Sequence, residues 1–336
     1  MTGAKQEDAI MPQLAPSRRN LLALAGAALL PAPAVLAQRS FPSRPIRLIV
    51  AFAPGGNSDT LARLITGKMA AALGQNIVVD NRGGAGGTLA AGAVASAPAD
   101  GHTLLFDAAS FVVAQFIHRS TPFNYERDFA PVGMVAEVPY ILAVPANERL
   151  RDLRGFLDKA KADRDGLSYG TPGVGSPGHL AGVLLAHRAG VKLEHIPYRG
   201  GAEVARDLAA GTLPAGILTA NSLNPVVQGG RAVALAVTSA KRGGIPGVPT
   251  IAESGIPDFD ITSWNAIFCR SGTPEEARQR LEAAIDAATS DAEVKARFAE
   301  IGAEATAAEP AKLGERLVRE RALIERLIRD TGISLG

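Results

Sequence analysis

The feature of this sequence that most constrains its fold is a repeated order of short apolar strand, glycine-rich turn and helix. The β-branched run 47–52 ends in Ala53-Pro54-Gly55-Gly56, and the pattern of a helix, 60–73, follows. A predicted strand at 76–79 leads into the glycine-rich segment 81–88 and then into an alanine-rich helix. Such alternation is typical of an α/β fold in which helices cover a parallel sheet.

A second region of the same kind begins near residue 129. A long extended segment, 132–144, is followed by predicted strands and helices that alternate as far as residue 238. A further extended segment leads to a strand at 266–268, and helical patterns fill 275–333. We therefore expect two lobes, one made of 41–137 plus 262–336 and the other of 138–261. Two extended crossings, near 136–144 and 257–266, would act as hinges.

Composition excludes several classes of function. The 336 residues are 47% hydrophobic and 20% charged, which suits folded domains with real cores. The net charge is +2, and Lys and Arg are scattered rather than gathered on one element, so a nucleic-acid partner is not expected. Cys269 is the only cysteine, which rules out an intrachain disulfide, and it is expected to be a buried, inert thiol. The histidines show no metal-ligand spacing, and we predict no metal and no cofactor.

The first 37 residues have the pattern of a cleavable export signal. Arg18-Arg19 precedes the uncharged stretch 21–30, which is too short to span a membrane, and Val35-Leu36-Ala37 supplies a cleavage site before Gln38. The paired arginines favour a twin-arginine signal, and an ordinary secretion signal is the alternative. Either route predicts a periplasmic protein.

Four turns are the candidate ligand contacts: 53–59 and 82–88 in the first lobe, and 170–178 and 219–222 in the second. Glycine allows a ligand to approach the backbone closely. The free N–H groups and the dipole at a helix start favour an anion. Each glycine taken alone is explained by the geometry of a tight turn. Several such turns facing one another indicate a binding cleft between the lobes, where strand ends meet helix starts.

An ordered set of short motifs runs through almost all of residues 41–336. It includes Asp100-Gly101-His102-Thr103-Leu104-Leu105 and His195-Ile196-Pro197-Tyr198-Arg199-Gly200. Further motifs of the set occur at 41–46, 53–59, 81–87, 128–132, 179–182, 235–239, 248–253 and 262–264. In these motifs and in their order the chain resembles a known family, the substrate-binding receptors of tripartite tricarboxylate transporters, also called the Bug family.

The resemblance implies a two-lobed Venus-flytrap fold of the periplasmic binding proteins (type II), closing around a small carboxylate. It also implies delivery to the membrane permease subunits of a tripartite tricarboxylate transporter, by a receptor expected to be a monomer. Asp59 is interpreted as a helix-capping and lobe-shaping residue, and Trp264 as hinge packing. The candidate ligand-binding residues are Pro54, Gly55, Gly56, Ser58, Gly86, Gly87, Asp107, Ser110, Thr171, Ser176, His179, Tyr198 and Asn221.

Two departures from the family pattern bear on specificity. Leu218-Thr219 stands where the family often has Asp-Asn, and Asn221 with Ser222 is expected to substitute. Asp107 stands where the family has small neutral residues. Either Asp107 caps the next helix, or it faces the cleft and meets a cationic group on an amino-acid-like ligand.

Two other functions fit part of the sequence. Gly173-Val174-Gly175-Ser176-Pro177-Gly178, with Glu194 further on, matches a dinucleotide-binding fingerprint and suggests an exported NAD(P)-dependent oxidoreductase. A receptor of this kind could also serve as the ligand sensor of a signalling protein. Because the family pattern covers far more of the chain than the fingerprint does, we predict a binding protein and not an enzyme.

Overall fold

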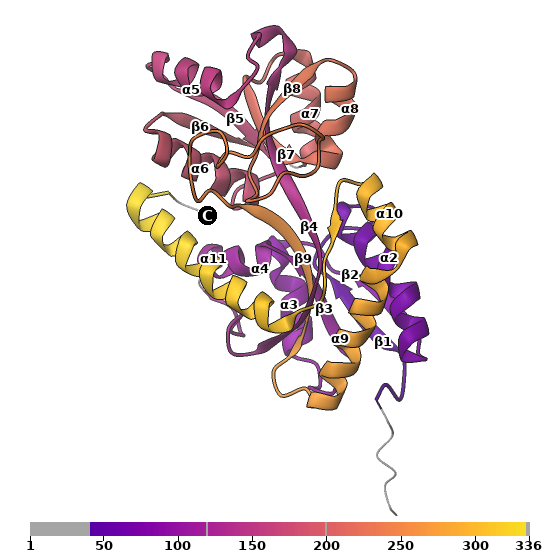
Figure 1. Cartoon of the computed structure of the whole chain (residues 1–336). Coiled ribbons are helices and arrows are strands. Elements are labelled where there is room, and N and C mark those ends of the chain that lie inside the picture. The colour runs from indigo at the N-terminus through magenta and orange to yellow at the C-terminus, as the bar shows by residue number, and fades with distance from the viewer. Residues whose placement is uncertain (1–40, 119, 199, 334–336) are drawn as a thin grey trace, which may run out of the picture. The chain divides into compact units, whose positions relative to one another are not determined.

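A computed structural model describes residues 41–118, 120–198 and 200–333 (Figure 1). The described residues form one compact unit. The predicted export signal, its cleavage after Ala37 and its type lie outside the described residues, as does Arg199 of the 195–200 motif. No helix in the described ranges is long and apolar enough to cross a membrane.

The first part of the sheet, called sheet A, runs in the order β2-β1-β3-β9-β4-β10. Strands β1, β2 and β3 are parallel, whereas β9 pairs antiparallel with both β3 and β4. The prediction of a parallel sheet is therefore right for the first three strands and wrong for β9, which runs opposite to both of its neighbours. The bounds of its strands are β1 Ile46–Val50, β2 Ile77–Asn81, β3 Thr103–Ala108, β4 Phe129–Pro145, β9 Thr262–Arg270 and β10 Glu304–Ala305.

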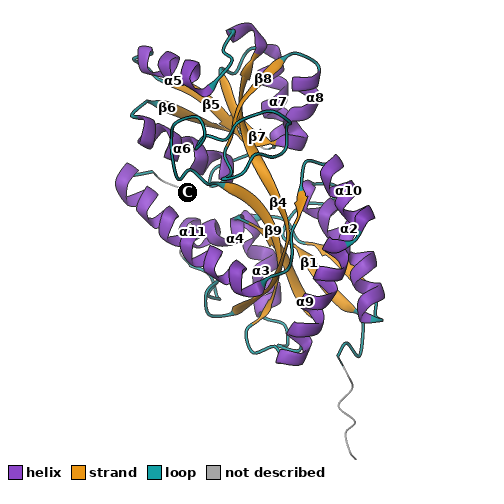
Figure 2. Ribbon diagram, viewed as in Figure 1, coloured by secondary structure: helices purple, strands orange, loops and turns teal. Residues whose placement is uncertain are grey.

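The second part, sheet B, uses the other end of β4. This end lies between β7 and β8, and the order continues from β7 to β5 and β6. Strand β4 pairs with β9 as far as Pro139 and with β7 from Tyr140 onward, so one strand belongs to both sheets (Figure 2). The remaining strands are β5 Leu167–Thr171, β6 Leu193–Pro197, β7 Ala215–Thr219 and β8 Ala232–Val237.

The helices cover both faces of each sheet. The bounds of those associated with sheet A are α2 Asn57–Leu73, η2 Ala85–Gly87, α3 Thr88–Ala95, α4 Ser110–Ile117, α9 Glu275–Ser290, α10 Ala292–Glu300 and α11 Pro310–Thr331. Those of sheet B are η3 Ala146–Glu148, α5 Leu153–Ala162, α6 Pro177–Ala189, α7 Gly201–Ala210 and α8 Ala220–Gln228.

The hydrophobic core is continuous between the sheets on one face only. A single cluster joins buried residues of α3, α4 and α11 to those of α5 and α6. On the opposite faces, α2, α9 and α10 bury a cluster against sheet A, and α7 and α8 bury a separate one against sheet B. Cys269 is fully buried in the sheet A cluster, as predicted.

Helix α11 is tied to both strands that cross between the sheets. Glu320 accepts hydrogen bonds from Trp264 Nε1 of β9 at 3.0 Å and from Arg316 Nε at 2.7 Å. Arg316 also pairs with Glu137 of β4. Trp264 is fully buried, as a packing residue would be, and its place at a hinge stays a prediction. The sequence offered no signal for the charged partners, which lie far apart in the chain.

Candidate functional site

The C-terminal ends of β1, β2 and β3 lead into turns at one edge of sheet A. The first helix, α2, begins at Asn57 rather than at the predicted Thr60, and its N-cap is Gly56, which has no side chain to cap it. The first helical hydrogen bond joins Thr60 N–H to Gly56 O at 3.0 Å. The N–H groups that precede it have no acceptor within the helix. Pro54, Gly55 and Gly56 are exposed in this turn.

Asp59 shapes this turn without being its N-cap. Its carboxylate accepts hydrogen bonds from Gly55 N–H at 2.8 Å, Asn81 Nδ2 at 2.9 Å and Arg63 Nε at 3.0 Å. Burial would raise the pKa of Asp59, but these three donors outweigh burial and hold that pKa below its usual value. The prediction that Asp59 caps the helix is thus wrong, because the N-cap is Gly56 and the Asp59 carboxylate instead accepts from Gly55, one residue before it.

Ser58 does not lie with the exposed turn. Its side chain is buried, and its Oγ accepts a hydrogen bond of 2.8 Å from Asn265 Nδ2 of β9. The side chain of Ser58 therefore binds α2 to the crossing strand.

The second turn of this edge bends through left-handed backbone. Gly84, Ala85, Gly86 and Gly87 have φ angles of 122°, 46°, 61° and 95°. Helix α3 follows directly with Gly87 as an N-cap that has no side chain. Gly86 is exposed and Gly87 is buried. Because three of its four residues are glycines, this turn exposes backbone groups and almost no side chains.

Asp107 lies at the end of β3 beneath the glycine turn and is fully buried. Its Oδ1 accepts hydrogen bonds from Ala108 N–H at 2.7 Å and Ser110 Oγ at 2.8 Å, while its Oδ2 has no partner among the described residues. Burial raises the pKa of Asp107 to about 7. The capping alternative is wrong in its simple form, because the N-cap of α4 is Ala109, not Asp107.

The main turn of sheet B, between β5 and α6, is closed by its own hydrogen bonds. Ser176 is the N-cap of α6 and accepts from His179 N–H at 3.3 Å. Its hydroxyl donates to Thr171 Oγ1, which lies 2.7 Å from His195 Nε2. The side chains of Thr171 and Ser176, predicted to meet the ligand, are thus engaged within the protein.

A stacked pair of histidines supports this turn from below. The rings of His179 and His195 lie 3.8 Å apart at 15°, and His179 Nδ1 accepts the Gly175 N–H at 3.1 Å. Burial lowers the pKa of each ring to about 4, and for His179 the neighbouring His195 adds to the effect. The ring of His179, predicted to contact the ligand, is thus buried and engaged within the protein. His195 lies in a family motif and has no role predicted from the sequence. Its stacking on His179 joins two separate segments, and such a contact leaves no pattern in the sequence.

Tyr198 and Asn221 lie at the other turns of sheet B. The Tyr198 hydroxyl donates to Asp207 of α7 at 3.1 Å. Burial raises the pKa of Tyr198, and the hydrogen bond to Asp207 adds to that rise. Asn221 Nδ2 donates to Asn57 Oδ1 at 3.5 Å, across from sheet B to the first residue of α2. The sequence prediction included Asn221 but missed its partner Asn57.

A second contact between the two sheets' surroundings joins the β5–α6 turn to helix α4. A Cβ added to Gly175 would lie 2.8 Å from Val113 Cγ1 and 3.0 Å from Ile117 Cδ1 of α4, so the β5–α6 turn packs directly on the α4 helix. Together with the Asn57–Asn221 hydrogen bond, this contact shows that the described residues adopt a state in which the turns of both sheets touch.

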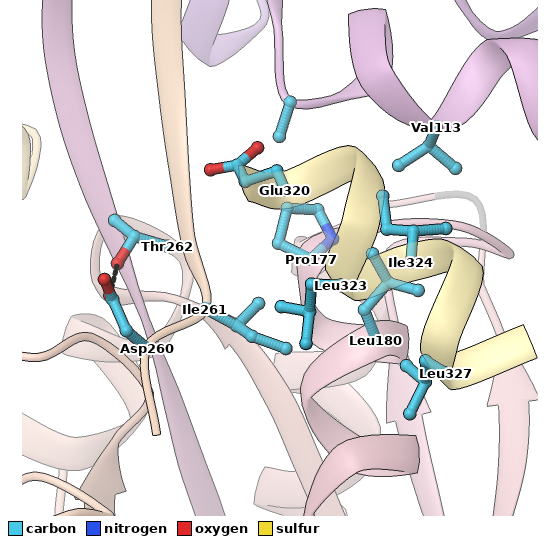
Figure 3. Close-up of a pocket in the computed structure, with 11 residues that line it drawn as sticks. Val113, Pro177, Leu180, Asp260, Ile261, Thr262, Glu320, Leu323, Ile324 and Leu327 are labelled. Carbon is cyan, nitrogen blue, oxygen red and sulfur yellow. Dashed lines mark hydrogen bonds between the residues drawn. The ribbon is translucent and has the colours of Figure 1, made fainter. Parts of the chain in front are cut away.

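A mostly apolar pocket adjoins these turns (Figure 3). In the close-up, side chains of α11 point toward Val113 of α4 and toward Pro177 and Leu180 of α6. The pocket has a volume of about 30 Å³, which is room for one or two water molecules. Its lining residues are Ala109, Val113, Pro177, Leu180, Asp260, Ile261, Thr262, Glu320, Leu323, Ile324 and Leu327.

The chemistry of the site follows from these placements. Around sheet A the turns present backbone N–H donors where helices begin at glycines. They also lie above the buried Oδ2 of Asp107, which accepts no hydrogen bond from the described residues. Around sheet B the main turn has its side chains bonded to one another. Within residues 41–118, 120–198 and 200–333, no group of three or more His, Cys, Asp or Glu side chains could hold a metal ion.

Comparison with known proteins gives a consistent set of relatives. A family model described as the tripartite tricarboxylate transporter family receptor matches residues 61–333. A protein encoded between tcbD and tcbE in Pseudomonas sp. strain P51 is 40% identical over 291 residues, covering 86% of this chain and 87% of that protein. Protein BugT of Bordetella pertussis is 33% identical over 299 residues, covering 88% and 92%.

Solved structures show the same two-lobed fold. A protein of R. palustris solved with adipate has a TM-score of 0.77 and 33% identity, covering 88% of this chain and 99% of its own. MatC of Rhodopseudomonas palustris, solved with bound malate, has a TM-score of 0.71 and 30% identity, covering 86% and 100%. The periplasmic binding protein BugD has a TM-score of 0.73 and 30% identity, covering 88% and 99%.

Proposed function

Because this chain belongs to the tripartite tricarboxylate transporter family of receptors, we propose that it captures a small carboxylate between sheet A and sheet B and closes around it. Members of this family are solute-binding receptors. The similar proteins solved with adipate and with malate support a carboxylate as the ligand class.

The observation that carries the proposal is the start of α2. Gly56 leaves the first N–H groups of this helix without a side-chain cap, next to a second glycine turn that also opens a helix. Uncapped helix starts are ready-made sites for an anion, since N–H groups and dipole both favour negative charge. We assign the carboxylate contacts of sheet A to the turns that contain Pro54, Gly55, Gly56, Gly86 and Gly87, where the uncapped first N–H groups of the helices supply the donors.

We assign the sheet B contacts to the backbone of the β5–α6 turn, residues 171–177, which we call the rigid wall. The β5–α6 turn is held by Ser176, Thr171 and the two stacked histidines, so it presents a preformed surface to the ligand. Tyr198 and Asn221 flank this wall on neighbouring turns. In this assignment the polar side chains of sheet B act mainly by fixing the backbone.

Closure is proposed to occur about β4 and β9. The lobes would be 41–137 plus 262–336 and 138–261, because β4 exchanges its partner β9 for β7 between Pro139 and Tyr140. The Asn57–Asn221 hydrogen bond and the packing of Gly175 on Val113 belong to the closed arrangement. A ligand that contacts both lobes favours this state by its differential affinity.

We further propose that the protein works in the periplasm after cleavage following Ala37, delivers its ligand to a membrane permease, and carries out no catalysis. The dinucleotide fingerprint at 173–178 supports an oxidoreductase poorly, since Ser176 caps α6 and the turn packs on α4. The Ser176 hydroxyl already accepts the His179 N–H at the start of that helix, and Gly175 of the fingerprint lies against α4.

The test is a thermal-shift screen followed by calorimetry on purified protein. The panel contains dicarboxylates, tricarboxylates, aromatic acids, amino acids and NAD(P). A ligand at a hundredfold excess over its Kd adds about 2.7 kcal/mol to the free energy of unfolding. Selective stabilisation by a carboxylate is the expected result. Stabilisation by NAD(P) alone would overturn the proposal in favour of the oxidoreductase.

A further inference from the structure

The buried carboxylate of Asp107 has one oxygen that the described part of the protein does not use. Oδ1 accepts two hydrogen bonds, from Ala108 N–H and from Ser110 Oγ, whereas Oδ2 accepts none from the described residues. A buried polar atom without a partner is costly, so each such atom in a native protein calls for an explanation. Among the described residues, burial and the hydrogen bonds from Ala108 and Ser110 account for the shifted pKa of Asp107, and no Lys, Arg or His contributes to it.

The position of Oδ2 links it to the proposed ligand site. A Cβ added to Gly87 would lie 3.1 Å from Asp107 Oδ2 and 3.4 Å from Ala51 Cβ. The oxygen therefore lies between the end of β1 and the glycine turn, where the turns 51–56, 84–87 and 107–110 meet. The same turns supply the proposed carboxylate contacts.

We propose that Asp107 Oδ2 accepts a hydrogen bond from an ammonium group of the ligand, so that this site selects small carboxylates that also carry an amino group. This inference rests on the proposed function and names its substrate class. An amino acid presents a carboxylate to the helix starts and an ammonium group to Asp107. A purely anionic ligand would instead bring a second negative charge toward a buried carboxylate, which like-charge repulsion disfavours.

Access to Asp107 requires the glycine turn to shift. Gly84, Gly86 and Gly87 can change φ at little cost because they have no side chains. Ala85, at a φ of 46°, is the one residue of the turn that is strained in its present conformation. Entry of the ligand would lift the turn from Oδ2 and bring the ammonium group into the space between Oδ2 and Gly87.

The proposal predicts a particular sign of pH dependence. Burial raises the pKa of Asp107 to about 7, so the free protein holds a proton there at lower pH. An ammonium ligand needs the ionised carboxylate and binds more tightly as pH rises from about 5.5 to about 7.5. A ligand without the amino group gains from the proton and binds more weakly over that range. Of the surrounding titratable groups, burial and Asp107 raise the pKa of Tyr125, which stays neutral, and His118 lies against Gly86.

The experiment compares matched ligands that differ only in the amino group. Calorimetry would measure Kd for aspartate against succinate and for 2-aminoadipate against adipate, at pH values of about 5.5 and about 7.5, on either side of the raised pKa. The Asp107→Asn variant keeps the size of the side chain and removes its charge. Asp158→Asn, on an exposed position of α5, is the matched control.

The expected result is tighter binding of the amino member of a pair, with Asp107→Asn weakening it by about 10- to 100-fold. The same substitution would change the Kd of the ligand without the amino group by less than about 3-fold. Asp158→Asn would change the Kd of neither ligand. Preference for the member without the amino group, or an equal effect on both, would overturn the inference and leave the proposed function standing. Failure of every carboxylate to bind would overturn both. If Asp107→Asn does not fold, the pH slopes of the unmodified protein decide the matter.

Discussion

The turns of sheet A and the main turn of sheet B solve the same structural problem differently. Both connect a parallel strand to a helix, but α6 begins at Ser176, which caps it, whereas α2 and α3 begin at glycines that do not. In sheet B, Thr171 and two stacked histidines complete a closed set of hydrogen bonds and ring contacts. In sheet A, Asp107 keeps an oxygen that no described residue contacts with a hydrogen bond. The difference indicates a rigid wall facing an adaptable one.

The largest expected effect comes from breaking the rigid wall. In Gly182→Ala, the added Cβ would lie 2.1 Å from Tyr169 Cε2, and Tyr169 donates to His179 O. We expect the free energy of unfolding to fall by about 3 kcal/mol in urea denaturation, because the ring has to move. Gly67→Ala is the control, since a Cβ there meets no described atom within 4 Å. That variant should be neutral or more stable by about 0.5–1 kcal/mol. Equal effects at both glycines would contradict the rigid wall.

The histidine pair provides a pH test of the same wall. Both rings have a pKa of about 4 in the folded protein, below the ordinary value of 6.5. The unfolded chain therefore binds more protons between these values, and stability falls as pH drops from 6.5 to about 4. The pKa difference alone would correspond to about 3 kcal/mol per ring. Because His195 is only partly buried, solvent screening reduces this figure, and we expect a loss of about 2–3 kcal/mol for the pair, measured by urea denaturation at a series of pH values. Replacing both rings, His179→Gln with His195→Gln, should flatten the slope, and the exposed His187→Gln should not.

Asp107 should make the stability of the free protein depend on pH in the opposite direction. Its pKa of about 7 lies above the ordinary 3.8, so its contribution to stability is lost as pH rises from about 4 to about 7. Asp107→Asn removes the buried charge and is expected to be more stable than the unmodified protein by about 2 kcal/mol at a pH of about 8. A less stable variant at that pH would mean that the ionised carboxylate is already satisfied in the free protein.

The smallest effect separates capping from ligand contact at Ser176. Ser176→Ala removes the N-cap of α6 and is expected to cost about 1 kcal/mol of stability. The Kd for the ligand should change by less than about 3-fold, because the hydroxyl oxygen already serves His179 N–H. A loss of affinity above about tenfold with unchanged stability would restore Ser176 as a direct contact.

Much of the fold could be predicted from the sequence, because its signals are local. The runs at 47–52 and 132–144, with glycines between strand and helix, located the strands and turns to within a few residues. The start of α2 was predicted at Thr60 instead of Asn57, since Ser58 and Asp59 are good capping residues that the structure uses inside the helix. The antiparallel direction of β9 was also missed, because strand direction depends on partners far away in the chain.

The candidate site was predicted less well than the turns that contain it. The glycines of 53–59 and 82–88 were found from their positions before helices, and the structure brings them to one edge of sheet A. The partners of the polar side chains were not found. Ser58 bonds to Asn265 and Tyr198 to Asp207, and neither pairing has a sequence signal.

The sequence by itself determined the order of strands, turns and helices and the family to which the chain belongs. Both depend on patterns of neighbouring residues, which a linear chain displays directly. Only the tertiary structure decided which polar groups satisfy one another, leaving Ser176 engaged and Asp107 Oδ2 without a partner among the described residues. Hydrogen bonds between distant segments depend on packing, and packing exists only once the whole chain has folded.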